Sequence, residues 1–320
     1  MTDGVRIVYD IRMNVKDSVL DKLLSCGRAS GAQLSRELGV SRNAVWKAVC
    51  ALREAGYEIA SDALGYSLIS GNVISETALR GYMKKSGIDI LIMPELPSTN
   101  DMAKTIAQKG RTVCVIAERQ TVGRGRLGRG FVSPAGCGIY FSVVVRPDLP
   151  LDKAQLITAY AAVAVARSVS RQSGAETKIK WVNDVFMCGK KICGILTEAA
   201  VSIEGNCLDY AVIGIGINVL KSAELPDVAT SIEEASGRKL DRNGLIAAVL
   251  DELSDIELGM KSGEFMSEYR IMSNIIDKEV IVNGDYIAIA RGIDDDGAVI
   301  LETADGLKKL NGGEVSLKLK

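Results

Sequence analysis

The 320-residue sequence contains no histidine, and its seven cysteines are scattered without a C-x-x-C pair. Without histidine the chain lacks the commonest general base, and serine–histidine and cysteine–histidine nucleophiles are excluded. The cysteine pattern predicts neither a zinc site nor a disulfide framework, which is typical of a protein in a reducing cytoplasm. Any chemistry must therefore depend on charge and on the positioning of groups.

A membrane span and a strong overall charge are also lacking. The longest uncharged helical stretch, 157–166, is far shorter than the roughly 20 apolar residues that cross a bilayer. Residues 1–12 are too charged and mixed for a signal peptide. The formal net charge is −1, so any basic surface must be local. We expect a cytoplasmic protein without membrane association, long enough for two or three domains.

The N-terminal segment, 1–70, predicts a winged helix-turn-helix. One short helix is expected to end at Gly27, a second to begin after Ser30 and end at Gly39, and a third to begin after Ser41. Two alternating strands follow over 57–69. This order of three helices and a hairpin is that of a DNA-binding module.

The third of these helices has a polar face and a local excess of positive charge. Between positions 28 and 53, five cations stand against one anion, as expected where a protein contacts phosphates. The predicted DNA-binding residues are Ser41, Arg42, Asn43, Trp46, Lys47 and Arg53. The alternative is a small three-helix interaction module whose charged face is merely solvated.

Alternating strands and helices predict the organisation of the remaining chain. Between 71 and 270, β-branched runs flank a long helix at 151–174, which indicates an α/β or α+β domain. Residues 271–320 contain four short alternating strands separated by Gly and Asp turns, which are typical of a small β-barrel. We therefore predict an α+β protein with domains at 1–70, 71–270 and 271–320.

The loop from Gln120 to Phe131, QTVGRGRLGRGF, combines four glycines with three arginines. Glycine lets a backbone approach a ligand closely at a cost in entropy, so this loop indicates an anionic ligand. Its G-x-G-x-x-G spacing does not indicate a dinucleotide fold, because Pro134 and a β-branched run follow instead of a helix. A kinase loop is excluded because the chain lacks H-R-D and D-F-G. The alternative is a solvated basic hairpin.

Three further segments are unusual. The segment 179–198, IKWVNDVFMCGKKICGILTE, contains an Asn-Asp pair and a hairpin tip that leads into an apolar strand. In VIGIGINV, Gly214 and Gly216 lie inside a strand, which they weaken unless a ligand approaches closely. PSTND, at 97–101, places two hydroxyls and an amide after an apolar strand. Taken singly, each polar residue here has an ordinary explanation in a turn or a solvated charge.

Taken together and in this order, STN, GRGRLGR, KWVND, KKICGIL and GIGIN resemble the biotin protein ligases. The N-terminal module makes the resemblance strongest to the bifunctional type, which is both ligase and biotin-operon repressor. The resemblance runs from about residue 15 to residue 320. It implies a central domain similar to class II aminoacyl-tRNA synthetases and a C-terminal SH3-like β-barrel.

The resemblance also implies a reaction and its participants. Biotin and ATP would give biotinyl-5′-AMP and pyrophosphate, with Mg²⁺ as the metal. The biotinyl group would then pass to a lysine of the biotin carboxyl carrier protein of acetyl-CoA carboxylase. Operator DNA and a homodimer are the other partners that the resemblance implies.

Residue roles follow from the resemblance position by position. Biotin would be contacted by Ser98, Thr99, Asn100 and Gln120. Arg126 and Lys191 would be catalytic by neutralising the biotin carboxylate and the α-phosphate of ATP. Asp184 would also be catalytic, and with Asn183 it would hold Mg²⁺. The other predicted ligand-binding residues are Gly123, Arg124, Gly125, Arg129, Phe131, Gly194, Gly214, Gly216 and Asn218.

Two departures and two alternatives accompany the resemblance. Phe131 stands where many relatives carry a tryptophan near the adenine, and residues 1–12 match nothing in the family, so Met13 is an alternative start. A lipoate-ligase-like acyl-protein ligase usually has an R-R-x-S-G-G-G loop and no winged helix. A catalytically inactive biotin-sensing repressor would not need Lys191 and Asp184 together. The features of the lipoate ligases are lacking here, and the presence of both Lys191 and Asp184 favours an active enzyme over the inactive repressor.

Overall fold

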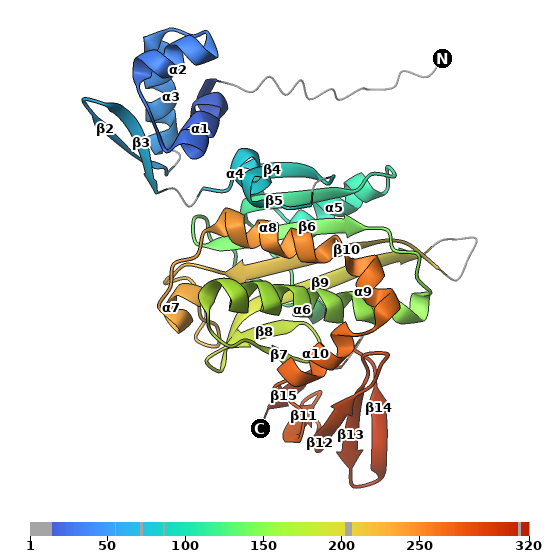
Figure 1. Cartoon of the computed structure of the whole chain (residues 1–320). Coiled ribbons are helices and arrows are strands. Elements are labelled where there is room, and N and C mark those ends of the chain that lie inside the picture. Colours follow the sequence, from blue (N-terminus) through green and yellow to red (C-terminus); the bar gives the residue numbers. More distant parts are fainter. Residues whose placement is uncertain are drawn as a thin grey trace, which may run out of the picture. The chain divides into compact units, whose positions relative to one another are not determined.

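The computed structural model describes residues 15–54, 56–70, 73–85, 87–201, 207–312 and 315–319. The chain forms two compact units, Met1–Ala78 and Leu79–Lys320 (Figure 1). Residues 1–12 and the alternative start at Met13 lie outside the described part of the chain. The division into three domains at 70 and 270 stays a prediction.

The N-terminal unit has the predicted order of helices and strands. Helices α1 (Val15–Cys26), α2 (Gly31–Leu38) and α3 (Arg42–Glu54) precede the hairpin of β2 (Glu58–Asp62) and β3 (Gly65–Ser70). A short strand, β1 (Arg28–Ala29), pairs with β3 and completes an antiparallel sheet in the order β1-β3-β2. The winged helix-turn-helix is confirmed.

The capping residues expected from the sequence set the boundaries of these helices. The Ser30 hydroxyl accepts a hydrogen bond from the Gln33 amide at 3.0 Å, and the Ser41 hydroxyl accepts one from the Ala44 amide at 3.1 Å. Gly39 ends α2 with φ of 66°, a left-handed conformation that glycine adopts without strain. Local chemistry thus fixes the turn between α2 and α3.

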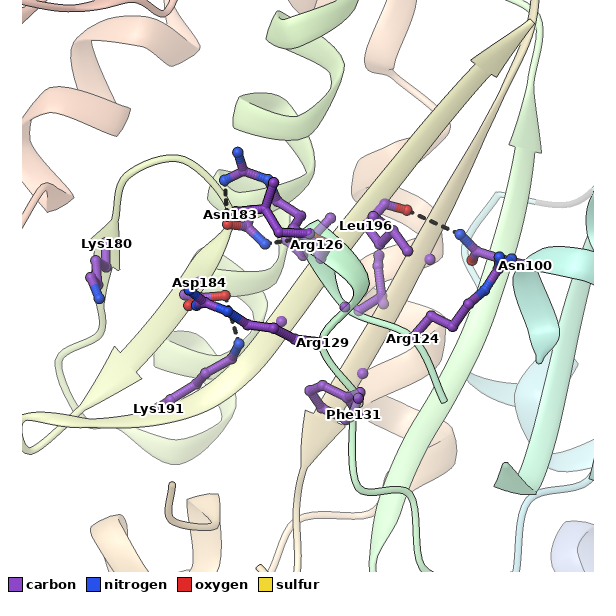
Figure 2. A pocket seen from close by; sticks show the side chains of 18 of the residues that line it. Asn100, Arg124, Arg126, Arg129, Phe131, Lys180, Asn183, Asp184, Lys191 and Leu196 are labelled. Atoms are coloured by element: carbon purple, nitrogen blue, oxygen red, sulfur yellow. Dashed lines mark hydrogen bonds and ion pairs between the residues drawn. The ribbon is translucent and has the colours of Figure 1, made fainter. Parts of the chain in front are cut away.

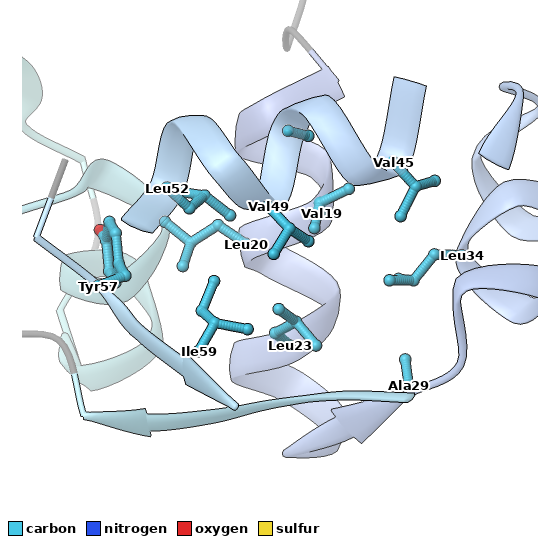
Figure 3. Close-up of a cluster of buried hydrophobic side chains, with 11 residues drawn as sticks. Val19, Leu20, Leu23, Ala29, Leu34, Val45, Val49, Leu52, Tyr57 and Ile59 are labelled. Carbon is cyan, nitrogen blue, oxygen red and sulfur yellow. The ribbon is translucent and has the colours of Figure 1, made fainter. Parts of the chain in front are cut away.

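Aliphatic side chains from the helices and the hairpin meet in one core within this unit (Figure 3). Its fully or nearly fully buried members include Val19, Leu20, Leu23, Leu34, Val45, Val49, Leu52 and Ile59. On the opposite face of α3, Asn43, Trp46 and Lys47 are exposed. The core therefore orients α3 so that its polar face remains in solvent.

A mixed sheet forms the centre of the second unit. Its strand order is β4-β5-β6-β10-β9-β8-β7, in which β4 and β5 run parallel and the other neighbours antiparallel. The strands are β4 (Asp89–Leu96), β5 (Val113–Gln120), β6 (Gly138–Val145), β7 (Lys178–Lys180), β8 (Asp184–Met187), β9 (Lys190–Val201) and β10 (Leu208–Asn218). With the helices around it, this sheet gives the α+β class that was predicted.

Helices cover both faces of this sheet. The long helix α6 (Ala154–Ser173) and α8 (Arg242–Leu253) lie across one face (Figure 1). On the other face, α5 (Thr99–Ala107) packs against Val115 and Val212. The remaining helices are α4 (Glu76–Tyr82), α7 (Ile232–Ser236), α9 (Ile256–Ser262) and α10 (Phe265–Met272). In the described residues we find no helix with the length and apolarity of a membrane span.

An antiparallel sheet in the order β14-β13-β12-β11-β15 ends the chain. Its strands are β11 (Lys278–Val282), β12 (Tyr286–Ile293), β13 (Val299–Thr303), β14 (Gly306–Leu310) and β15 (Leu317–Leu319). The prediction of four strands missed β14. The segment GLKKL does not alternate between apolar and polar residues, and its first four residues are exposed, so it lacks the pattern by which a half-buried strand is recognised.

We expect Leu52→Ala to destabilise the N-terminal unit by about 2–5 kcal/mol, because it empties a fully buried position in a small core. Hydrogen exchange of the α3 amides measures this change directly. The matched control is Trp46→Ala on the same helix, whose parent side chain is 54% exposed and should contribute little. Unchanged amide protection in Leu52→Ala would contradict the core described here.

Candidate active site

One cavity of the second unit brings together most of the predicted site residues (Figure 2). It lies among the start of α5, the loop after β5, the turn between β7 and β8, and strands β9 and β10. The predicted residues that line it are Ser98, Thr99, Asn100, Gln120, Arg124, Gly125, Arg126, Arg129, Phe131, Asn183, Asp184, Lys191, Gly194, Gly214 and Gly216. Gly123 is outside this lining, and Asn218 lines an adjoining cavity.

Hydrogen bonds fix the polar side of this cavity. Ser98 is the N-cap of α5. The next residue, Thr99, donates from both its amide and its hydroxyl to Gln120 Oε1, at 2.9 and 3.1 Å. Gln120 Nε2 in turn donates to the Ser133 hydroxyl at 3.1 Å. The beginning of α5 and the end of β5 therefore hold each other in place.

The Asn100 amide is held at both ends. Its Oδ1 accepts from the Ser142 hydroxyl at 2.6 Å, and its Nδ2 donates to Glu198 Oε2 at 2.7 Å. Nδ2 also lies 3.3 Å from the Leu196 carbonyl oxygen (Figure 2). Although burial acts to raise it, hydrogen bonds from Lys104 and Asn100 hold the pKa of Glu198 below its ordinary value. A charged carboxylate thus orients Asn100.

The glycines of β10 make room for two of these side chains. A Cβ on Gly214 would lie 2.0 Å from Asn100 Oδ1, and one on Gly216 would lie 2.5 Å from the Phe131 ring. The sequence predicted that these glycines let a ligand approach the strand. In this structure the space above them contains Asn100 and Phe131, so the glycines shape the site through its side chains.

The glycine-arginine loop closes on itself between two strands. Phe131 N donates to the Gly123 carbonyl at 2.9 Å, and a Cβ on Gly123 would lie 2.3 Å from the Phe131 carbonyl oxygen. Gly123 is therefore required by the closure of the loop. No α-helix follows β5 before β6 in these fully described residues, so the exclusion of a dinucleotide fold is confirmed.

Two arginines of this loop contact different parts of the cavity. Arg124 forms an ion pair with Asp101 of α5, and its Nη2 lies 3.7 Å from Glu198 Oε2. Arg126 donates to Asn183 Oδ1 at 3.2 Å (Figure 2). It also donates to the Gly312 carbonyl. Burial lowers the pKa of the Arg126 guanidinium. Water therefore solvates this cation only partly.

Lys191 and Asp184 form an ion pair with an Nζ–Oδ1 distance of 2.7 Å (Figure 2). The pairing of β8 with β9 brings them together, and Lys191 Nζ also lies 5.9 Å from the centre of the Phe131 ring. Beside Asp184, Asn183 donates from Nδ2 to the Ile195 carbonyl at 2.7 Å. The two predicted metal ligands are therefore neighbours at one edge of the cavity.

The residues around Asp184 offer few ligands to a metal ion. No group of three or more cysteine, aspartate or glutamate side chains suited to a metal occurs among the residues that the structure describes. Mg²⁺ does not need such a group, because it is commonly held by one or two carboxylates together with substrate phosphates and water. Asn183 and Asp184 fit an Mg²⁺ site of this kind, in which substrate phosphates and water supply the other ligands.

Sequence reasoning missed several residues of the cavity. They are Leu127, Gly130, Lys180, Trp181, Ile195, Leu196, Ile215, Val315, Ser316 and Leu317. Lys180 was detectable, because it belongs to the KWVND segment; burial lowers its pKa, against the opposing effect of Asp184. The last three come from the far end of the chain, and no local pattern there indicates a site.

The predicted DNA-binding residues belong to the other unit and fall into two groups. Ser41 caps α3, and Arg42, Asn43, Trp46 and Lys47 are exposed on it. Arg53, in contrast, donates to the Ile59 carbonyl at 2.6 and 2.9 Å and to Ser61.

Ion pairing also reduces the positive charge that was counted over 28–53. Arg28 pairs with Asp62 of the hairpin at 2.6 Å. With Arg53 held by the same hairpin, both side chains brace the wing. The exposed charge that α3 offers to a phosphate is therefore centred on Arg42 and Lys47.

Models of known protein families match three segments of the chain. The model of the biotin/lipoate A/B protein ligase family matches residues 93–218, that of the biotin protein ligase C-terminal domain matches 275–318, and that of a helix-turn-helix domain matches 18–67. The chain is 36% identical to the bifunctional ligase/repressor BirA of Bacillus subtilis, over 90% of this chain and 93% of the relative. It is 32% identical to BirA of Escherichia coli, over 90% and 92%.

Solved structures include a similar fold. The biotin protein ligase from Aquifex aeolicus in complex with biotin and ATP superposes with a TM-score of 0.61 and 28% identity. The match covers 72% of this chain and 99% of that structure.

We expect Gly214→Ala to lower the free energy of unfolding by about 1–3 kcal/mol, because the added Cβ would overlap the Asn100 amide. Urea denaturation measures the change. Asn100→Ala should remove the overlap, so the double variant should lose less than the sum of the single changes. Gly292→Ala, in strand β12 where a Cβ meets nothing within 4 Å, is the matched control. Strict additivity would contradict the contact.

Proposed function

The chain belongs to the biotin protein ligase family, and from this premise we propose that it is a bifunctional biotin protein ligase and biotin-responsive repressor. The observation that carries the proposal is the single cavity that gathers the STN segment, the loop arginines and the KWVND and KK segments. The winged helix-turn-helix supplies the second activity. The carrier protein of acetyl-CoA carboxylase, operator DNA, a homodimer and a cytoplasmic location belong to this proposal.

The proposed first step joins two anions. A biotin carboxylate oxygen attacks the α-phosphorus of ATP, the bond to the β-phosphate oxygen breaks, and pyrophosphate leaves. Arg126 and Lys191 lower the barrier by neutralising the carboxylate and the phosphoryl oxygens. Since Lys191 pairs with Asp184 in the structure, a substrate carboxylate that takes Lys191 also releases Asp184.

Asn183 and Asp184 would hold Mg²⁺, which when bound neutralises phosphate oxygens. The nucleophile of the second step is a lysine of the carrier protein, so this chain supplies none. The neutral amine of that lysine attacks the carbonyl of the mixed anhydride, an amide forms, AMP leaves, and the proton that the nitrogen loses passes to the leaving phosphate or to water. Closure of the glycine-arginine loop over the adenylate would exclude water and so protect the anhydride from hydrolysis.

The surroundings of Asn218 support the proposal that a nucleotide binds in the adjoining cavity. Its side chain is 5% exposed, and Nδ2 donates to the Thr230 carbonyl at 3.2 Å. Its Oδ1 is buried and has no hydrogen-bond partner among the described residues, which is costly unless a ligand supplies a donor. The exocyclic amine of adenine is such a donor, and Phe131 lines the same cavity with an aromatic face.

We expect Lys191→Ala and Arg126→Ala each to reduce biotin-dependent pyrophosphate exchange by about 10²-fold or more, because each removes a preorganised cation. Lys178→Ala, which removes an exposed lysine of strand β7 that pairs with Glu176, is the matched control and should exchange like the parent. Lipoate should not replace biotin. A parent protein without exchange would contradict the ligase, and a fully active Lys191→Ala or Arg126→Ala would contradict the site.

We further expect the chain to be mostly monomeric alone, to dimerise with a non-hydrolysable biotinyl-adenylate analogue, and then to bind an inverted repeat. The reason is that one short recognition helix makes few phosphate contacts, so two copies are needed. Sedimentation measures the dimer, and titrations at several salt concentrations measure DNA binding. Lys47→Ala should reduce the slope of log K against log salt by about 1–2. A mass that the analogue does not change would refute ligand-dependent dimerisation.

A further inference from the structure

Gln155, in the first turn of α6, connects that helix to two separate segments of the C-terminal sheet. Its Nε2 donates to the Gly297 carbonyl at 2.6 Å, and its Oε1 accepts from the Gly312 amide at 2.6 Å. Gly297 lies in the turn between β12 and β13, and Gly312 follows β14. The side chain thus uses both ends of its amide, and each bond goes to backbone rather than to a mobile side chain.

A second hydrogen bond leads from the Gly297 carbonyl to the candidate active site. Trp181 Nε1 donates to this oxygen at 2.9 Å, so the carbonyl accepts from both Trp181 and Gln155. Trp181 is only 4% exposed and lines the cavity two positions before Asn183. The turn that contains the predicted metal ligands is therefore fixed to the C-terminal sheet.

The Gly312 backbone makes the corresponding connection to the glycine-arginine loop. Its amide donates to Gln155, and its carbonyl accepts from Arg126 Nη2. Arg126 Nη1 in turn donates to Asn183 Oδ1 at 3.2 Å, which leads back to the turn that carries Trp181. We call this closed path of hydrogen bonds the Gln155 ring; its members are Gln155, Gly297, Trp181, Asn183, Arg126 and Gly312.

We propose that Gln155 is a positioning residue that sets the orientation of the Arg126 guanidinium through Gly312; this rests on the proposed role of Arg126 in adenylation. The oxygens of Asn183, Gly312 and Val315 that accept hydrogen bonds from its N–H groups are uncharged. These bonds direct the guanidinium without placing a negative charge against it. Electrostatic stabilisation depends on such fixed geometry, because a mobile cation must be reorganised during the reaction.

Apart from Arg126 itself, whose charge is kept when Gln155 is replaced, the ring includes none of the residues predicted to contact biotin. Thr99 and Gln120 are held by each other and by Ser133, and Asn100 by Ser142 and Glu198. Loss of Gln155 should therefore affect the chemical step and leave biotin binding unchanged. A general loss of structure would instead affect both.

The test is Gln155→Leu in the full chain, assayed by biotin-dependent pyrophosphate exchange. We expect kcat to fall about 5–50-fold, since a misplaced catalytic group costs rate in this range, while KM for biotin changes less than about 2-fold. Thr158→Val is the matched control: it lies one turn along the same helix and loses a 2.8 Å hydrogen bond to Thr197 that is outside the ring. It should keep the parent rate.

A double-mutant cycle separates positioning from general stability. If Gln155 acts through Arg126, then Gln155→Leu should cause little further loss in an Arg126→Ala background. An equal fold-loss in both backgrounds, or a kcat of Gln155→Leu like that of the parent, would overturn the proposal. Absence of exchange in the parent would instead contradict the ligase itself. If Gln155→Leu lowers the thermal midpoint of unfolding, Gln155→Met, which keeps the side-chain length, supplies the same test.

Discussion

The ion pair between Lys191 and Asp184 is the interaction on which the proposed chemistry depends. A partly buried lysine in a cavity that also contains Lys180 and Arg129 is costly unless an anion compensates it. Asp184 does so at 2.7 Å in the structure. A substrate carboxylate would take over that task, so the same electrostatics that stabilise the cavity without ligand also create its affinity for anions. The binding of an anionic substrate and the freeing of Asp184 are then one exchange of partners.

Strand β10 shows how one element supplies both stability and a site. Alternate residues of a strand face opposite sides of the sheet. Ala211, Ile213 and Ile215 are buried on one side. On the other side Gly214 and Gly216 give up their side chains, so that Asn100 and Phe131 can lie against the backbone. Burial of one face in the core holds the strand in position. The other face can therefore lack side chains at Gly214 and Gly216.

Features that depend on neighbours in the sequence were predictable, and those that depend on pairing were not. Ser30, Gly39 and Ser41 mark helix ends through their own backbone chemistry, and the glycine-arginine loop is recognisable from its composition. Ser142, in contrast, is an ordinary strand serine. It reaches Asn100 because the pairing of β6 with β10 places it opposite Gly214. Leu317 enters the cavity through its pairing with Val282 in the C-terminal sheet, and Val315 and Ser316 directly precede that strand; no local pattern encodes this pairing.

Glu198 links the floor of the cavity to the loop that would cover it. Its carboxylate accepts from Asn100 at 2.7 Å, pairs with Lys104, and lies 3.7 Å from Arg124 of the loop. Asn100 on the floor and Arg124 on the loop therefore interact with the same carboxylate. If a ligand attracts Arg124 away from Glu198, less positive charge compensates the carboxylate that accepts from Asn100. A change at Asn100 likewise alters the interaction between Glu198 and Arg124. Because such coupling is reciprocal, whatever effect ordering of the loop has on occupation of the floor, occupation of the floor has to the same extent on ordering of the loop.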